Sequence, residues 1–180
     1  MSSSNNMSLE SVSVSSIMIT DVKTARENQS IQAACNILYK NKIGSVVIIK
    51  NSTSENNESK VPVGIVTERD IVRLVSLHDN KRLVHESVHL LMKAPVITIN
   101  PNSSIRDAME TMQQKDIRRL PVVDNKGKLL GIITDKDIFR VILKNQTLAS
   151  SATTDQILVD QQSIFGRFTD YWLRGLPIRP

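Results

Sequence analysis

Residues 64–73 read GIVTERDIVR, and residues 131–140 read GIITDKDIFR. Six of these ten positions are identical, and the other four pair Val with Ile, Glu with Asp, Arg with Lys and Val with Phe. A stretch that occurs twice with its chemical character preserved indicates an internal repeat. The chain is therefore interpreted as two copies of one structural pattern.

The repeat extends toward the N-terminus. Residues 30–49 align with residues 104–123 at an offset of 74, whereas the two quoted stretches are offset by 67. The seven extra residues of the first copy fall in the polar stretch 51–60, where a hairpin loop absorbs an insertion at little cost. Apolar residues at i, i+3, i+4 and i+7 predict one buried helix face in each copy. They are Ile31, Ala34, Cys35 and Leu38 in the first copy and Ile105, Ala108, Met109 and Met112 in the second.

Each copy is predicted to have the element order β-α-β-β-α. Strands are expected at 22–24, 45–49 and 61–66, and again at 96–99, 120–123 and 129–133. The closing helices are expected at 68–77 and 135–143. Copies this short bury little surface alone, so we expect an α+β fold in which two repeats pack with pseudo-two-fold symmetry.

The predicted organisation has four parts. We expect a disordered, Ser/Asn-rich N-terminus over 1–13, a first repeat over 14–80, a second over 81–145, and a linker with a C-terminal tail over 146–180. Four of the six aromatic residues of the chain lie in this tail with helical spacing, which predicts docking on a partner protein, a second protomer or the module itself. These four are Phe165, Phe168, Tyr171 and Trp172.

Composition argues against several functions. The net charge is +5, but residues 1–144 hold only two aromatic rings, which disfavours base stacking with single-stranded nucleic acid. The single Cys35 cannot form an intramolecular disulfide, and no apolar run reaches the roughly eighteen residues of a membrane helix. We therefore expect a cytoplasmic protein that does not contact a membrane.

The pattern Gly-x-x-Thr-x-x-Asp is the main candidate for chemistry. Each Thr stands where a predicted strand ends and a helix begins, so the exposed N–H groups and the positive helix end favour a phosphate. One turn later, an ionised Asp can accept hydrogen bonds from two ribose hydroxyls. The alternative is a capping box, in which the two side chains only satisfy helix-terminal donors. The pattern comprises Gly64, Thr67 and Asp70 and again Gly131, Thr134 and Asp137.

These doubled motifs, the paired Ile-Met and Leu-Met segments and the LPVVD strand at 120–124 resemble the CBS domain family, and the tandem pair resembles a Bateman module. The resemblance spans residues 14–144. It implies a non-enzymatic sensor that binds AMP, ADP, ATP or S-adenosylmethionine in a cleft between the repeats and signals by conformational change. It also implies a homodimer, with no cofactor required.

The resemblance assigns roles to particular residues. Thr67, Asp70, Thr134 and Asp137 are expected to meet the ribose and phosphate of the ligand. Arg118 or Arg119 is expected to contact a phosphate, the alternative being a solvated pair beside Asp116. The first copy has Gly44 and Ser45 at the two arginine positions, which favours a neutral or sulfonium adenosine compound there. The adenine is expected near Thr20, Asp21, Val22, Ala94, Pro95 and Val96.

Two further features of the sequence resemble catalytic sites, but neither predicts catalysis. Residues 85–89 read HESVH and match the zinc-protease pattern H-E-x-x-H, but the repeat aligns them with residues 11–15, so exposed surface is expected. Cys35 on an apolar helix face predicts an inert thiol. Neither a metal site nor a catalytic residue is expected. Two alternatives to the sensor stay open: a structural or protein-interaction module without ligand, and a nucleic-acid-associated regulator.

Overall fold

The computed structural model describes residues 9–50, 60–77 and 81–144. The predicted aromatic tail lies outside the described residues. The described chain divides into two compact units. The larger unit comprises Met18–Pro101 and Leu120–Ile132, and the smaller comprises 9–17, Asn102–Arg119 and 133–144.

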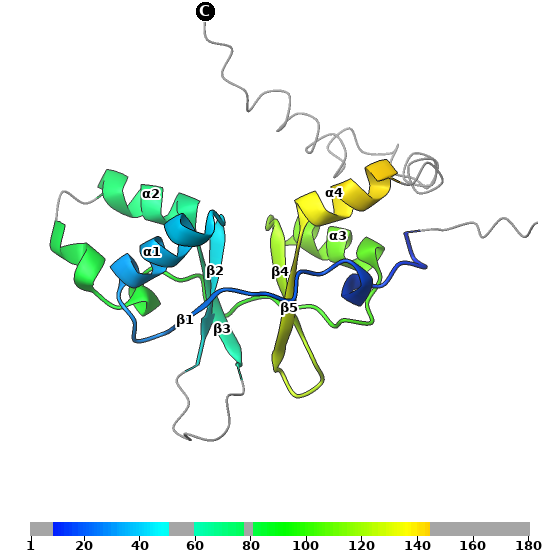
Figure 1. The fold of residues 1–180 in the computed structure, drawn as a ribbon, viewed down its shortest axis with the longest axis horizontal. Coiled ribbons are helices and arrows are strands. Elements are labelled where there is room, and N and C mark those ends of the chain that lie inside the picture. Colours follow the sequence, from blue (N-terminus) through cyan, green and yellow to red (C-terminus); the bar gives the residue numbers. More distant parts are fainter. Residues whose placement is uncertain (1–8, 51–59, 78–80, 145–180) are drawn as a thin grey trace, which may run out of the picture. The chain divides into compact units, whose positions relative to one another are not determined.

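The larger unit contains the three-stranded sheet β1-β2-β3, with α1 and α2 beside it (Figure 1). β1 runs parallel to β2, and β2 runs antiparallel to β3. Two short 3-10 helices, η2 and η3, follow α2. The bounds are β1 Thr24–Arg26, α1 Ile31–Asn41, β2 Ser45–Ile49, β3 Pro62–Thr67, α2 Glu68–Leu77, η2 Lys81–His85 and η3 Val88–Leu90.

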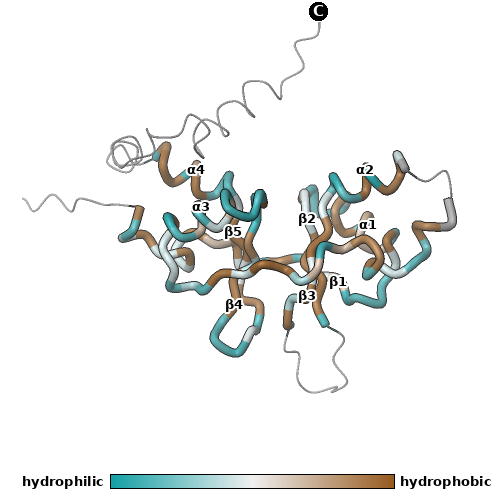
Figure 2. The backbone as a smooth tube through the Cα atoms, turned by 180° about the vertical axis from the view of Figure 1, so that it is seen from behind, coloured by the Kyte–Doolittle hydropathy of each residue, from teal (hydrophilic) through white to brown (hydrophobic). Residues whose placement is uncertain are grey.

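The smaller unit contains the 3-10 helix η1 (Val14–Ser16) and the helices α3 (Ile105–Gln114) and α4 (Asp135–Lys144), which contact each other. A two-stranded sheet pairs β4 (Arg119–Val123) with β5 (Leu129–Thr134), and most of both strands belongs to the larger unit. The hairpin between these strands is hydrophilic (Figure 2). The described residues thus confirm a mixed α and β fold with two similar sets of helices and strands.

The helix faces predicted from periodicity are buried. In α1, Ile31, Ala34 and Leu38 are buried and Cys35 is half-buried. In α3, the four predicted residues are all buried, namely Ile105, Ala108, Met109 and Met112. Each helix begins at a serine whose hydroxyl oxygen accepts a backbone N–H, from Ala33 at Ser30 and from Asp107 at Ser104. These caps fix the start of the equivalent helix in both copies.

Backbone contacts between the repeats occur in symmetric pairs. The N–H of Ile31 donates to the carbonyl of Glu86 at 2.9 Å, and the N–H of Ile105 donates to the carbonyl of Val12, also at 2.9 Å. These two bonds are related by the offset of 74. In each of them, the segment that leads into one repeat binds the start of the long helix of the other repeat. The same exchange of segments therefore occurs in both copies.

Two predicted strands differ from the structure. β1 begins two residues later than expected, and the side chain of Val22 instead packs against a buried cluster that includes Val47 and Ile49. The expected strand at 96–99 is reduced to a single parallel bridge between Ile99 and Val122. In the first copy, the N–H of Glu27 extends the ladder by donating to Ile49. In the second copy, the position equivalent to Glu27 is Pro101, which has no N–H to donate.

The predicted disorder of residues 1–13 does not hold for the described residues 9–13. Leu9 and Val12 are buried at 2% and 6% exposure, and the carboxylate of Glu10 lies 3.1 Å from Arg106 Nε. Residues 9–13 are thus held by two buried apolar side chains and an ion pair, although the sequence around them is rich in Ser and Asn. None of the helices in the described part of the chain has the length and apolar character needed to cross a membrane.

Candidate functional site

The first Thr–Asp pair forms a helix cap at the junction of β3 and α2. Asp70 Oδ2 accepts the backbone N–H of Thr67 at 2.8 Å and the Thr67 hydroxyl at 2.6 Å. Asp70, the third residue of α2, is only 7% exposed. Both bonds therefore use one oxygen of the carboxylate, and Oδ1 makes no bond to Thr67.

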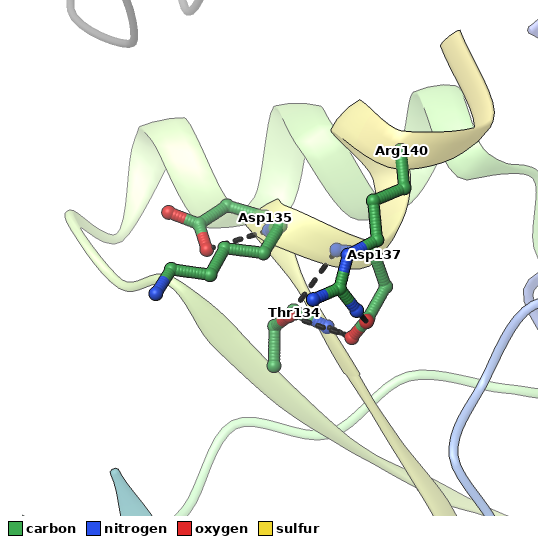
Figure 3. Close-up of polar contacts among 5 residues, drawn as sticks. Thr134, Asp135, Asp137 and Arg140 are labelled. Carbon is green, nitrogen blue, oxygen red and sulfur yellow. Dashed lines mark hydrogen bonds and ion pairs between the residues drawn. The ribbon is translucent and has the colours of Figure 1, made fainter. Parts of the chain in front are cut away.

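The second pair repeats this geometry at the junction of β5 and α4. Asp137 Oδ2 accepts the N–H of Thr134 at 3.0 Å and its hydroxyl at 2.6 Å, as Figure 3 shows. The N–H of Asp137 also donates to Thr134 Oγ1 at 3.3 Å, which completes a capping box. The capping alternative is thus real in both copies. The cap uses only Oδ2 of each aspartate, so Oδ1 can interact with another group.

A cation lies near the second oxygen of each aspartate. Lys93 Nζ is 3.8 Å from Asp70 Oδ1, and Arg140 NH1 is 3.5 Å from Asp137 Oδ1. Arg140 comes from the same helix as Asp137, three residues later, and points toward it (Figure 3). Lys93 comes from the segment that leads into the second repeat. It was not among the predicted site residues, because the repeat aligns it with Ile19 rather than with a charged residue.

The position of Lys93 is fixed by backbone pairing. Its N–H donates to the carbonyl of Ile65 at 2.9 Å, and the N–H of Ile65 donates back at 3.2 Å. Ile19 pairs in the same manner with Ile132, with two bonds of 2.9 Å. Each leading segment therefore lies against the strand that ends in a motif threonine, Thr67 in β3 and Thr134 in β5.

The motif glycines make this pairing possible. A Cβ on Gly64 would lie 2.5 Å from Met92 Sδ, and one on Gly131 would lie 2.7 Å from Met18 Sδ. Such separations are far below van der Waals contact, so a methionine of the leading segment occupies the space that any other residue would need. The glycine of the motif is thus required for close approach of this segment. The repeat predicted the two glycines but not their partners.

The predicted adenine-vicinity residues flank these paired segments in sequence. Ala94 and Pro95 are exposed and Val96 is half-buried, directly after Lys93. Thr20 and Asp21 are exposed after Ile19, and Asp21 forms an ion pair of 2.7 Å with Lys23. The structure therefore joins residues 94–96 to the strand carrying Thr67, through Lys93.

Arg118 and Arg119 lie close to Asp135 at the start of α4. The carbonyl of Arg118 accepts the N–H of Asp135 at 3.1 Å. Burial raises the pKa of the Asp135 carboxyl above its ordinary value, although the N–H of Lys136 and the guanidinium groups of Arg118 and Arg119 act in the opposite direction. Asp135 projects away from Asp137 (Figure 3). Positive charge therefore gathers beside the first turn of α4, where the helix dipole also favours an anion.

The H-E-x-x-H match has a structural role. His85 and His89 are exposed, and they lie in separate 3-10 helices rather than on one α-helix face. The carbonyl of Glu86 accepts the N–H of Ile31 and so ties this segment to the start of α1. No group of three or more His, Cys, Asp or Glu side chains in the described residues is arranged to hold a metal ion. Burial raises the pKa of the half-buried Cys35 thiol, which lowers its reactivity.

Comparison with known proteins gives the same family twice along the chain. The model of the CBS domain matches residues 14–77 and 86–144. Protein MK0525 of Methanopyrus kandleri is 40% identical over 137 residues, which cover 74% of this chain and 64% of that protein. The chain spans between 24% and 64% of the length of the first three curated relatives that it matches.

Two solved structures share the fold of this chain, and both of those proteins are complexed with adenosine compounds. The CBS domain pair of protein MJ0100, in complex with 5′-methylthioadenosine and S-adenosyl-L-methionine, has a TM-score of 0.62 and 27% identity, covering 74% of this chain and 97% of that one. The CBS domain protein PAE2072 from Pyrobaculum aerophilum, complexed with AMP, has a TM-score of 0.65 and 25% identity, covering 79% of this chain and 100% of that one. With two family matches and this fold, the chain belongs to the CBS domain family, of which it contains a tandem pair.

Proposed function

We propose that this chain is a regulatory, non-enzymatic module that binds an adenosine-derived ligand of the AMP, ADP, ATP or S-adenosylmethionine class. One observation carries the proposal. In both copies, a buried aspartate uses Oδ2 for the helix cap, while its Oδ1 makes only a long contact with a cation, 3.8 Å to Lys93 at Asp70 and 3.5 Å to Arg140 at Asp137. A ribose offers two adjacent hydroxyls, which suit such an acceptor. The adenosine ligands of MJ0100 and PAE2072 add support from similar folds.

The proposed sites have a defined composition. The first site consists of Thr67 and Asp70, with residues 94–96 near the adenine. The second consists of Thr134 and Asp137 with Arg118 and Arg119, and residues 20–22 are proposed to meet an adenine as well. A ligand that contacts both repeats at once would couple their packing, which provides a route for a conformational signal.

The first test is a ligand panel. Thermal unfolding of the full chain is measured with AMP, ADP, ATP, S-adenosylmethionine and 5′-methylthioadenosine, and GMP serves as a matched purine control. A ligand that binds only the folded state stabilises it by about 2.7 kcal/mol at one hundred times its Kd. We expect at least one adenosine compound to raise the Tm and GMP to leave it unchanged. No shift with any adenosine compound at millimolar concentration would falsify the sensor function.

A second candidate function is a structural or protein-interaction module without ligand. The observation that favours it is that each threonine and aspartate already satisfy one another as a cap. Under this candidate, Asp70→Asn and Asp137→Asn change stability but no adenosine affinity exists to change. Isothermal titration of the unmodified chain with the same panel separates the two functions.

The output of the module is also a proposal. We propose a homodimer whose tail, residues 163–180, docks on a protein partner, a second protomer or the module. Analytical ultracentrifugation of the full chain and of a chain lacking residues 163–180, each with and without AMP, tests both points. If the mass of the assembly, its stability and its partner binding are all unchanged after the deletion, the proposed docking of the tail is refuted.

A further inference from the structure

The first site holds a cation that neither the motif nor the repeat predicts. Lys93 Nζ lies 3.8 Å from Asp70 Oδ1, which is longer than a charge-assisted hydrogen bond of about 2.7–2.9 Å. The lysine side chain is 62% exposed. The ammonium group therefore interacts electrostatically with the carboxylate without forming a short hydrogen bond to it. Its N–H donors can bind another acceptor.

The backbone of Lys93 is held by hydrogen bonds, while its side chain is largely exposed. Two hydrogen bonds hold its N–H and carbonyl against Ile65, two residues before Thr67. Met92, beside it, fits against Gly64. From this fixed point, a flexible four-carbon stem lets the ammonium group shift by a few ångström around Asp70. The segment that leads into the second repeat thus places the positive charge of Lys93 beside the cap of the first repeat.

The equivalent position in the other copy is Ile19, which is 46% exposed and has no charge. There the aspartate meets Arg140 of its own helix instead. In the first copy, the residue aligned with Arg140 is Arg73, but the ion pair of Asp70 is formed with Lys93. The first site therefore obtains this positive charge from a different segment.

We infer that Lys93 makes the first site selective for an adenosine ligand with an anionic 5′ group, such as AMP, over a neutral one, such as 5′-methylthioadenosine. This inference rests on the proposed function. A lone aspartate repels a phosphate, and an ammonium group within 4 Å offsets that repulsion and can donate to the phosphate oxygens. It reverses the expectation, drawn from Gly44 and Ser45, that the first copy favours neutral or sulfonium compounds.

The test measures AMP and 5′-methylthioadenosine by isothermal titration. The full chain is used, both unmodified and with Asp137→Asn, which weakens the second site while its amide oxygen still accepts the N–H of Thr134. Lys93→Gln is expected to weaken AMP binding about tenfold or more, the size of a lost charge-assisted hydrogen bond, and to change 5′-methylthioadenosine less than about twofold. Lys93→Arg restores AMP binding. Raising the salt weakens AMP binding with Lys93 present more than with Gln.

The matched control is Lys126→Gln, which removes the same charge from the exposed hairpin between β4 and β5. It leaves both affinities unchanged. If Lys93→Gln lowers the two affinities equally, or lowers neither, the selectivity of Lys93 is refuted while adenosine binding stands. If the unmodified chain binds neither compound, the proposed function fails and the inference with it. Circular dichroism of each variant checks folding, and Lys93→Met replaces any Gln variant that does not fold.

Discussion

The two helix caps of this molecule have two hydrogen bonds in common but differ in a third, from the N–H of Asp137 to Thr134 Oγ1, and in their surroundings. Thr67 with Asp70 and Thr134 with Asp137 each share one carboxylate oxygen between an N–H and a hydroxyl. The cation beside the first cap is a lysine from another segment, whereas the cation beside the second is an arginine one turn along the same helix. The Thr–Asp bonds are thus repeated in both copies, whereas the cation beside them comes from a different part of the chain in each.

The largest expected effect comes from the motif glycines. Gly64→Ala and Gly131→Ala place a methyl group against Met92 and Met18, and such overpacking costs about 1–3 kcal/mol. The two sites differ in their nearest obstacles. Gly64 meets three atoms of Met92, while Gly131 also meets the carbonyl oxygen of Ile19 at 3.0 Å. Urea denaturation of both variants measures the loss.

A rescue experiment tests the methionine contacts of both glycines. Met92→Ala in the Gly64→Ala background removes the contacts of the new methyl group with Sδ and Cγ but leaves Cβ of residue 92 at 3.1 Å, so we expect partial rescue. Met18→Ala likewise removes Sδ and Cγ beside Gly131→Ala and leaves the Ile19 carbonyl oxygen at 3.0 Å, so partial rescue is expected there as well. Stability losses that simply add in the double variants would contradict the methionines as the obstacles.

The next effect is that of the caps themselves. Asp70→Ala and Asp137→Ala each remove the acceptor of a backbone N–H and a hydroxyl, which costs about 1 kcal/mol for a helix cap and more where the donors stay buried. Because each substitution removes the same two hydrogen bonds to its threonine, we expect the two losses to agree within about 0.5 kcal/mol. The Asn variants recover part of each loss, since an amide oxygen also accepts. A loss confined to one copy would mean that only that copy depends on its cap.

Much of the fold follows from the sequence because the repeat supplies two observations of every element. The strand at 45–49 and the helix at 68–77 were predicted with the bounds that the structure shows. Ser30 and Ser104 act as caps where the periodic pattern begins. The sequence also predicts that each threonine and aspartate lie close together, because residues three positions apart at the start of a helix lie within one turn.

Other features could not be derived from the repeat. An offset relates equivalent residues but does not tell which copy a segment pairs with, so the binding of Lys93 to Ile65 and of Ile19 to Ile132 was not foreseen. Lys93 was missed for this reason, because its role depends on a strand of the other copy. The strand predicted at 96–99 does not form because Pro101 and Pro121 lack the N–H groups that Glu27 and Val47 donate at the equivalent positions of the first copy.

The smallest expected effect concerns pH and again distinguishes the copies. Burial raises the pKa of Asp135, so the unfolded chain releases this proton at a lower pH than the folded chain does. Between those two pKa values the folded state binds more protons, and stability falls as pH rises through this window. The contribution is therefore fully present below the unfolded pKa and lost above the folded one.

Asp135→Asn removes this titration while keeping an oxygen that accepts the N–H of Lys136, which Asp135 Oδ1 accepts at 2.8 Å. The variant should gain stability relative to the unmodified chain as pH rises from about 3 to 7, following the sign of the linkage relation. Glu68→Gln, at the equivalent and exposed position of α2, is the matched control. Urea denaturation across this range gives the difference at each pH. A difference that stays flat would show that the charges of Arg118 and Arg119 balance burial at this carboxyl, and one that moves in the opposite direction would show that they outweigh it. In the second case, Asp135 would hold the two arginines and so compete with a phosphate for them.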